Sequence, residues 1–156
     1  MSQENVESKN TAVVERFLAA FDRRWPTKAE LDELLDPEVR FIERPNMINP
    51  GGSERDIAGI HAGLEAGRKL LAWQSYEVRD HVANGETVVT RMRWNGEFAV
   101  DTGTWRAGTR MAAWCVAHYR LAAGRIVRIE QHDCYAQPSR PHEAPTKDTP
   151  DALKNP

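Results

Sequence analysis

The feature that most constrains the fold is a change in the spacing of apolar residues near the middle of the chain. Before about residue 71, apolar residues such as Val14, Phe17 and Leu18 recur at helical spacing. After it, four stretches alternate apolar and polar residues and are rich in Val, Tyr, Trp and Thr, as half-buried strands are. They cover 74–82, 87–94, 111–121 and 125–135. Helices followed by a meander of strands predict an α+β domain with an antiparallel sheet.

Short motifs predict where the first elements begin and end. Thr27 followed by Glu30 has the spacing of a capping box, so a second helix is expected to start there. A short strand at 39–44 and a loop at 45–52 then lead into a third helix that ends near Leu71. Asn84-Gly85 and Ala123-Gly124 stand where tight hairpin turns belong.

Composition narrows the class of protein. The 156 residues suit one domain with a sizeable core. A net charge of −2 without a stripe of Lys or Arg gives no reason to expect a nucleic-acid partner. No secretory signal is evident, and no apolar stretch approaches the roughly 18 residues of a membrane span. A cytoplasmic location and no membrane partner are therefore the default expectations.

Both ends of the chain are expected to be disordered. Residues 1–8 are polar, and residues 138–156 carry five prolines among charged and polar residues. Such segments bury too little apolar surface to offset the entropy lost on ordering. A single domain is predicted between them, over residues 9–137.

Two segments carry a resemblance to a known family. They are DPEVRFIERPNMINPGG, with the helix behind it, and the closing hairpin HYRLAAGRIVRIEQHDCY. Over about residues 9–137 the chain resembles the nuclear transport factor 2-like superfamily, and more narrowly its SnoaL-like branch. The resemblance implies a cone-shaped, curved antiparallel sheet wrapped around three N-terminal helices, with a small-molecule pocket at its open end.

The resemblance implies a choice of functions, because one fold hosts many. The superfamily includes ketosteroid isomerase, scytalone dehydratase, limonene epoxide hydrolase and polyketide cyclases. We therefore expect a cofactor-independent enzyme that uses acid/base chemistry on a small apolar molecule. The alternative is a non-catalytic ligand-binding or dimerisation module on the same fold.

One departure from the family matters. Ketosteroid isomerase-like members place a catalytic Asp just before the proline that ends the first strand, where this chain has Arg44. Its carboxylate, Glu43, comes one residue earlier, and a one-residue shift turns a side chain to the other face of a sheet. Glu43 either enters the cavity or forms an ion pair at the rim with Arg44 or Arg55.

The last hairpin predicts further site residues. If Ala123-Gly124 is a two-residue turn, Leu121 lies opposite Ile126. For every facing pair on these two antiparallel strands, the two residue numbers then add up to the same value. The concave face of the last strand then reads Val127, Ile129, Gln131, Asp133 and Tyr135. The same register places His118 and Asp133 on one wall, as an acid/base pair or as buried polar groups that satisfy each other.

The candidate residues follow from this register. The candidate catalytic residues are Asp133, His118 and Glu43. The candidate ligand-binding residues are Gln131, Tyr135, Trp94, Trp114 and Met92. No cofactor-binding motif is present, so no cofactor is expected.

The opposite face of the hairpin bears on metal binding and assembly. Cys115, His132 and Cys134 share that face in this register, but no fourth ligand is evident, so no metal is expected. A small, apolar strip on the same face predicts a homodimer through the convex side of the sheet, where relatives dimerise. The strip consists of Ala113, Cys115, Ala117, Tyr119 and Leu121. The two cysteines are expected to be free and largely buried there.

Overall fold

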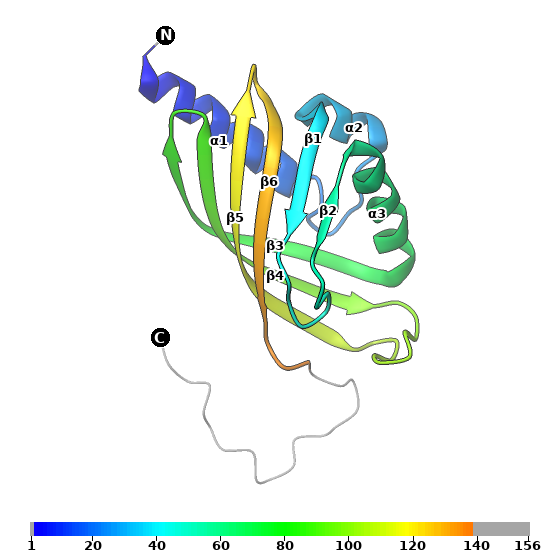
Figure 1. Cartoon of the computed structure of the whole chain (residues 1–156). Coiled ribbons are helices and arrows are strands. Elements are labelled where there is room, and N and C mark those ends of the chain that lie inside the picture. Colours follow the sequence, from blue (N-terminus) through cyan, green and yellow to red (C-terminus); the bar gives the residue numbers. More distant parts are fainter. Residues whose placement is uncertain (1, 139–156) are drawn as a thin grey trace, which may run out of the picture.

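The computed structural model describes residues 2–138, which fold into a curled, open six-stranded sheet and three helices (Figure 1). The helices are α1 (Gln3–Ala19), α2 (Lys28–Leu34) and α3 (Ile57–Leu70). The strands are β1 (Leu35–Glu43), β2 (Ser53–Arg55), β3 (Leu71–Asn84), β4 (Thr87–Phe98), β5 (Arg110–Ala122) and β6 (Arg125–Tyr135). The predicted α+β cone is confirmed.

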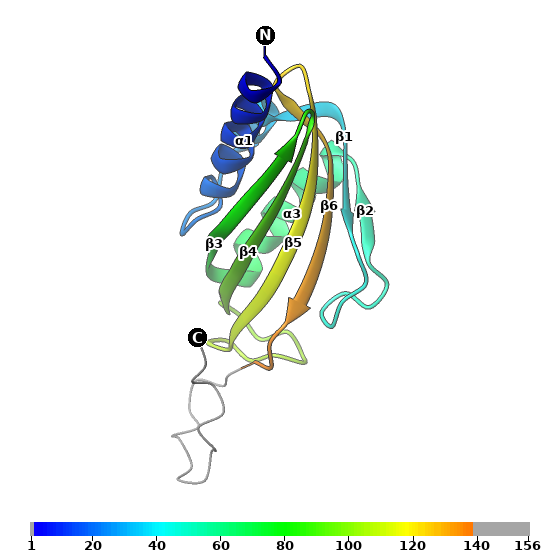
Figure 2. The same ribbon diagram turned by 90° about the vertical axis from the view of Figure 1, so that its left-hand side faces the viewer.

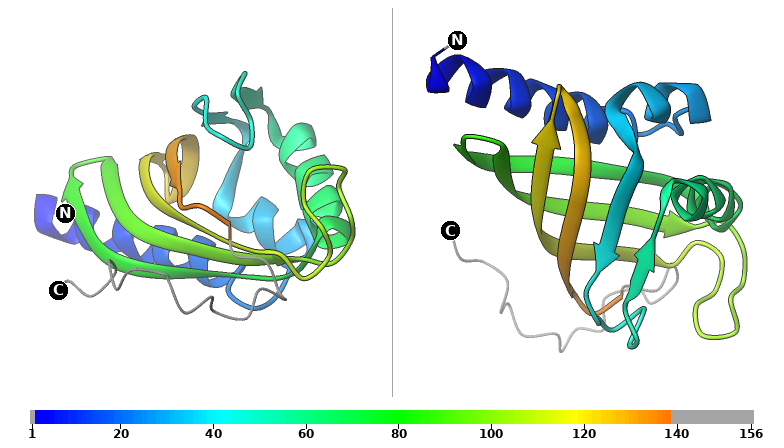
Figure 3. Two further views of the ribbon diagram at one scale, coloured as in Figure 1. Left: turned by 90° about the horizontal axis from the view of Figure 1, so that it is seen from below. Right: turned by 45° about the horizontal axis from the view of Figure 1, so that its top comes forward.

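The sheet runs in the order β2-β1-β6-β5-β4-β3. Its neighbours are antiparallel except for β1 and β6, which are parallel, so the sheet is mixed rather than wholly antiparallel. The strands curl, and the helices pack on the concave side (Figures 2 and 3). The core lies between them, where Phe17 of α1 meets the ring of Tyr119 on β5 edge-on, with centroids 6.1 Å apart.

Local signals place the helix starts where expected. The Thr27 hydroxyl accepts from the backbone N–H of Glu30 at 3.2 Å, and the Glu30 carboxylate accepts from the backbone N–H of Thr27 at 2.7 Å. The predicted capping box is thus confirmed. Asp56 caps α3 by accepting from the backbone N–H of Gly59.

The last hairpin turn is also as predicted, but its register is not. Ala123 and Gly124 both have positive φ, as a type I′ turn requires, and Leu121 pairs with Ile126. A β-bulge then follows, so Arg120 pairs with Arg128. The bulge adds one residue to β6 and moves every later partner on β5 by one position.

The cause of the bulge is apolar burial. Ile126 and Ile129 are three residues apart and both have no exposed surface. A regular strand would turn one of them to solvent, because its side chains alternate between faces. The extra residue lets both isoleucines face the core.

The shifted register reverses the predicted faces of β5. The predicted dimer strip, Ala113, Cys115, Ala117, Tyr119 and Leu121, faces inward and is buried. His118 and Trp114 are exposed on the convex face, so the prediction that they share a wall with Asp133 is wrong. Cys115 is a buried free thiol, whereas Cys134 is free and exposed.

The N-terminal helix begins earlier than the sequence suggests. Helix α1 starts at Gln3, within the segment 1–8 that was expected to be disordered. Contacts distant in sequence account for the difference, because Glu7 accepts from the Gly85 N–H and Asn10 donates to the Gly85 carbonyl. The predicted tail, 138–156, lies outside the described residues apart from Pro138.

We predict that the Asn10 contact stabilises the fold. Asn10→Ala removes the 3.0 Å hydrogen bond from the Asn10 amide to the Gly85 carbonyl. Ser8→Ala is the matched control, because Ser8 is exposed on the same helix and gains similar helix propensity. The melting temperature of Asn10→Ala should lie about 2–6 °C below that of the control, equivalent to about 1–1.5 kcal/mol. Equal melting temperatures would show that this contact does not anchor α1.

Candidate functional site

The end of β1 and the short strand β2 build one wall of the cavity. They pair antiparallel, with Glu43 opposite Ser53 and Phe41 opposite Arg55. Phe41 and Glu43 face inward, and Arg44 faces outward, where it forms an ion pair with Glu130. The structure therefore places Glu43, and not Arg44, in the cavity.

The Glu43 carboxylate is held by several donors. The Arg55 guanidinium donates to it at 2.8 Å, and the Asn46 amide donates at 2.9 Å. The Ser53 hydroxyl and the Asn49 amide add longer contacts, at 3.3 and 3.4 Å. Only 14% of the Glu43 side chain is exposed. Both expectations for Glu43 thus hold together, since it faces inward and also pairs with Arg55.

Asp133 lies on β6 in a different setting. The Gln131 amide donates to both of its carboxylate oxygens, at 2.9 and 3.1 Å. No salt bridge links Asp133 to a cation among residues 2–138. Burial raises the pKa of Asp133 above its ordinary value, against hydrogen bonds from Cys115 and Gln131, and the nearby charge of Glu43 raises it further. Asp133 is therefore the carboxyl group of the site whose proton affinity is increased.

The cavity has a polar part and an apolar part. The polar part, about 170 Å³, is lined by both carboxylates together with Gln131, Tyr135 and Trp94. The apolar part, about 190 Å³, is lined mainly by rings and aliphatic side chains of the helices and of β1 and β3. Phe41, Arg55, Gln74, Tyr76 and Gln131 line both parts. These shared residues place the two parts next to each other under the helices.

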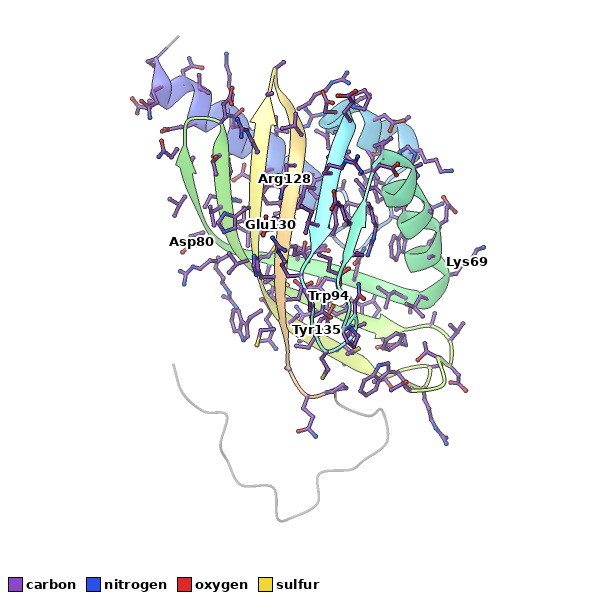
Figure 4. The ribbon with its side chains drawn as sticks, viewed as in Figure 1. Lys69, Asp80, Trp94, Arg128, Glu130 and Tyr135 are labelled. Atoms are coloured by element: carbon purple, nitrogen blue, oxygen red, sulfur yellow. The ribbon has the colours of Figure 1, made fainter. Side chains whose placement is uncertain are left out.

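Aromatic rings shape the polar part. Trp94 of β4 and Tyr135 of β6 meet edge-on with centroids 6.0 Å apart, and Figure 4 shows them side by side. Gly96 leaves room for the indole, because a Cβ there would lie 2.6 Å from Trp94 Cζ2. Burial and the charges of Asp133 and Glu43 raise the pKa of Tyr135, so its hydroxyl remains a hydrogen-bond donor.

The structure distributes the predicted residues unevenly. Asp133, Glu43, Gln131, Tyr135 and Trp94 meet around the polar part of the cavity. Met92 lies in the hydrophobic core with 1% exposure and does not line the cavity, and Trp114 and His118 lie outside it. Gln74 and Tyr76 of β3 line the cavity but were not predicted, because single polar residues in an alternating strand usually face solvent.

Comparison with known proteins now identifies the family. Residues 14–129 match the model of the SnoaL-like domain. The chain belongs to the SnoaL-like domain family. No curated protein matches its sequence.

Solved structures share the fold of this SnoaL-like domain at low sequence identity. A candidate SnoaL-like polyketide cyclase from Jannaschia sp. CCS1 is 18% identical, with a TM-score of 0.68 over 82% of this chain and 87% of that one. IdmH, a candidate polyketide cyclase from Streptomyces antibioticus, is 20% identical, with a TM-score of 0.64 over 80% and 91%. An LEH-like epoxide hydrolase from M. tuberculosis is 16% identical, with a TM-score of 0.62 over 82% and 84%.

The three residues with zinc-type side chains do not form a set in this SnoaL-like domain. Cys115 faces inward, whereas His132 and Cys134 are exposed on the convex face. Between residues 2 and 138, no three His, Cys, Asp or Glu side chains are arranged to hold a metal ion. In the same part of the chain, no helix is long and apolar enough to cross a membrane.

A larger hollow, about 690 Å³, is an open depression on the convex side of the sheet, and Cys115 and Asp133 line it as well as the cavity. Its arginines are already engaged, for example Arg91 with Asp80 and Arg44 with Glu130. Arg79 and Arg93 lie over the exposed ring of Trp114. We regard the inner cavity as the candidate site because two carboxylates, Glu43 and Asp133, and the polar groups of Gln74, Gln131 and Tyr135 converge on it.

The raised pKa of Asp133 predicts a pH-dependent loss of stability. Unfolding returns this pKa toward its ordinary value of 3.8. At pH values between 3.8 and the higher pKa of the folded protein, the folded state therefore binds more protons than the unfolded state. Stability therefore falls as the pH rises through this interval. Asp133→Asn removes the effect, so its melting temperature relative to the wild type should increase across the same interval.

Asp80→Asn provides a control of opposite sign. Hydrogen bonding from Arg91 lowers the pKa of Asp80, so its stabilising effect is present above the ordinary pKa of 3.8 and is lost as the pH falls. Relative to the wild type, Asp80→Asn should therefore become less stable as the pH rises. Thermal melts from about pH 3.5 to 8 measure both differences. A pH-independent difference for Asp133→Asn would contradict the assignment.

Proposed function

We propose that this SnoaL-like domain is an enzyme that transfers protons on a small, largely apolar molecule without a cofactor. The observation that supports it is a half-buried carboxyl group of raised pKa, Asp133, in the polar part of a cavity whose neighbouring part is lined largely by apolar side chains. Isomerisation, cyclisation, dehydration and epoxide hydrolysis all need such a group. Among similar structures, one is a named epoxide hydrolase and two are candidate cyclases.

The two carboxylates are suited to different roles. Arg55 and the neighbouring amides compensate and orient the charge of Glu43. Asp133 has the Gln131 amide and the Cys115 thiol as side-chain partners and no cation among residues 2–138, and burial favours its protonated form. Pairs of acids in unequal environments are typical of acid/base sites. Asp133 would therefore act as general acid or base, and Glu43 would be the fixed charge that helps to tune it.

The remaining polar groups would orient the substrate. Gln131 is held against Asp133, and the Tyr135 hydroxyl stays protonated beside it. The adjoining apolar part would take the hydrocarbon body of the substrate, with Phe17, Phe21 and Trp25 on its wall. Burial and the charge of Asp133 raise the pKa of Cys115, which keeps it a thiol and makes it a poor nucleophile.

We predict that Asp133→Asn abolishes turnover and preserves binding. The protein is incubated in D₂O with a panel of small enolisable ketones and epoxides, including acetophenone and styrene oxide. Deuterium exchange and diol formation are followed by NMR. Loss of the general acid/base should slow the reaction by about 10²-fold or more. The dissociation constant should change by no more than about threefold, because an Asn side chain still accepts from Gln131.

Asp80→Asn, on the convex face, is the control for turnover and should react like the wild type. Two results would instead support the non-catalytic ligand-binding module. One is a wild type that binds members of the panel and converts none of them. The other is an Asp133→Asn variant that reacts at the wild-type rate.

We also propose that a second copy of the chain covers the convex face of the sheet. The strip that first suggested a dimer is in the core, so the support comes from other residues. Trp114 and Val116 on β5 are 53% and 36% exposed beside the broad depression. Exposed apolar groups at the centre of a sheet face are typical of two-fold interfaces.

Trp114→Glu should therefore dissociate the dimer. Sedimentation velocity at micromolar concentration should give twice the monomer mass for the wild type and the monomer mass for Trp114→Glu. Met47→Glu is the control, because Met47 is 51% exposed but lies in the loop between β1 and β2. A wild type that sediments as a monomer would refute the interface.

A further inference from the structure

Gln74 is an unusual residue on the wall of the cavity. It is a polar side chain with only 7% exposure, and it lines both the polar and the apolar parts. Its backbone is fixed on two sides, since Gln74 pairs with Gly96 of β4 and its carbonyl accepts from the Arg23 N–H at 2.8 Å. A buried amide costs free energy unless its polar atoms find partners.

Trp94 determines which way this amide points. The indole N–H of Trp94 donates to the Gln74 side-chain oxygen at 3.0 Å. An indole nitrogen can only donate, so the oxygen of the amide must face Trp94 and the NH₂ group must face away. Between residues 2 and 138, no side chain or carbonyl accepts from that NH₂ group, and the fully enclosed side-chain atom without a partner is His81 Nε2, so the Gln74 nitrogen remains accessible. The cavity wall therefore carries an oriented, accessible donor without a protein acceptor.

The geometry points to Gln74 as the residue that binds an oxygen atom of the ligand, with Trp94 as the residue that positions it. The acceptor would be a carbonyl oxygen, which can approach from the cavity where no protein group does. This assignment rests on the proposed function and specifies the substrate class as a ketone or ester. Asp133 lines the same polar part, so a carbonyl held by Gln74 would lie within one small space with the acid/base group.

Two nearly isosteric probes test the assignment without any need for turnover. Acetophenone carries a carbonyl oxygen where α-methylstyrene carries a CH₂ group, and both are small aromatic molecules. The two dissociation constants are measured by NMR titration, and their ratio gives the selectivity for the oxygen. Comparing this ratio between variants cancels the different hydration of the two probes.

Gln74→Met keeps the size of the side chain and removes the donor. The preference for acetophenone over α-methylstyrene should fall about tenfold, as expected for one hydrogen bond of about 1.4 kcal/mol. Trp94→Phe keeps an aromatic ring and removes the indole N–H, so the Gln74 amide can turn and part of the preference should be lost. In the double variant, Trp94→Phe should add nothing to the effect of Gln74→Met.

The outcomes separate this inference from the proposed function. Asp80→Asn, on the convex face, should retain the wild-type preference, because it leaves Gln74, Trp94 and the cavity unchanged. A preference that falls in Gln74→Met supports the inference even if no variant turns over a substrate. An unchanged preference in Gln74→Met, additive effects in the double variant, or a wild type that does not bind acetophenone would overturn it. Melting curves confirm that each variant is folded before its ratio is interpreted.

Discussion

Burial of two isoleucines on the same side of β6 is the constraint on which the rest of this SnoaL-like domain depends. Ile126 and Ile129 both reach the core only because a bulge separates them. Beyond the bulge, Gln131, Asp133 and Tyr135 follow Ile129 on the inward face. The bulge also turns Tyr119 inward and His118 outward on the neighbouring strand. The burial of Ile126 and Ile129 at the closed end of the cone thus determines which polar side chains of β6 face the cavity at its open end.

The site combines two carboxylates in the polar part of the cavity, and its electrostatics follow from their unequal surroundings. Glu43 is at the sheet edge, where β2 and the adjoining loop bring a guanidinium and several donors to it. Asp133 is in the middle of the sheet, where one amide and one thiol, from Gln131 and Cys115, contact it and no cation of the described chain does. Burial therefore raises the pKa of Asp133, and the nearby charge of Glu43 raises it further.

Space for Arg55 comes from helix α3. A Cβ at Gly63 would lie 3.0 Å from Nη1 of Arg55, and one at Gly59 would lie 3.0 Å from Cβ of Arg55. Each glycine within a helix costs about 1 kcal/mol relative to alanine. These glycines lower the helix propensity of α3 and leave a channel along which the guanidinium reaches Glu43. Gly96 of β4 likewise makes room for a side chain, the Trp94 ring, and so allows the contact of Trp94 with Gln74.

Local features of the sequence were sufficient for the types of all elements except the short strand β2, and for the capping box of α2, the turn at Ala123-Gly124 and the inward face of β6. Each of these depends on neighbouring residues, because alternation within a strand and hydrogen bonds within a turn do not involve distant parts of the chain. Glu43, Gln131, Asp133 and Tyr135 were found in this way. Only the tertiary structure decided which residues of β5 face them, since that depends on a bulge which buries Ile126 and Ile129 against the helices. It also decided that Gln74 is buried, because its partner, Trp94, comes from another strand, and no pattern within β3 distinguishes a buried amide from an exposed one.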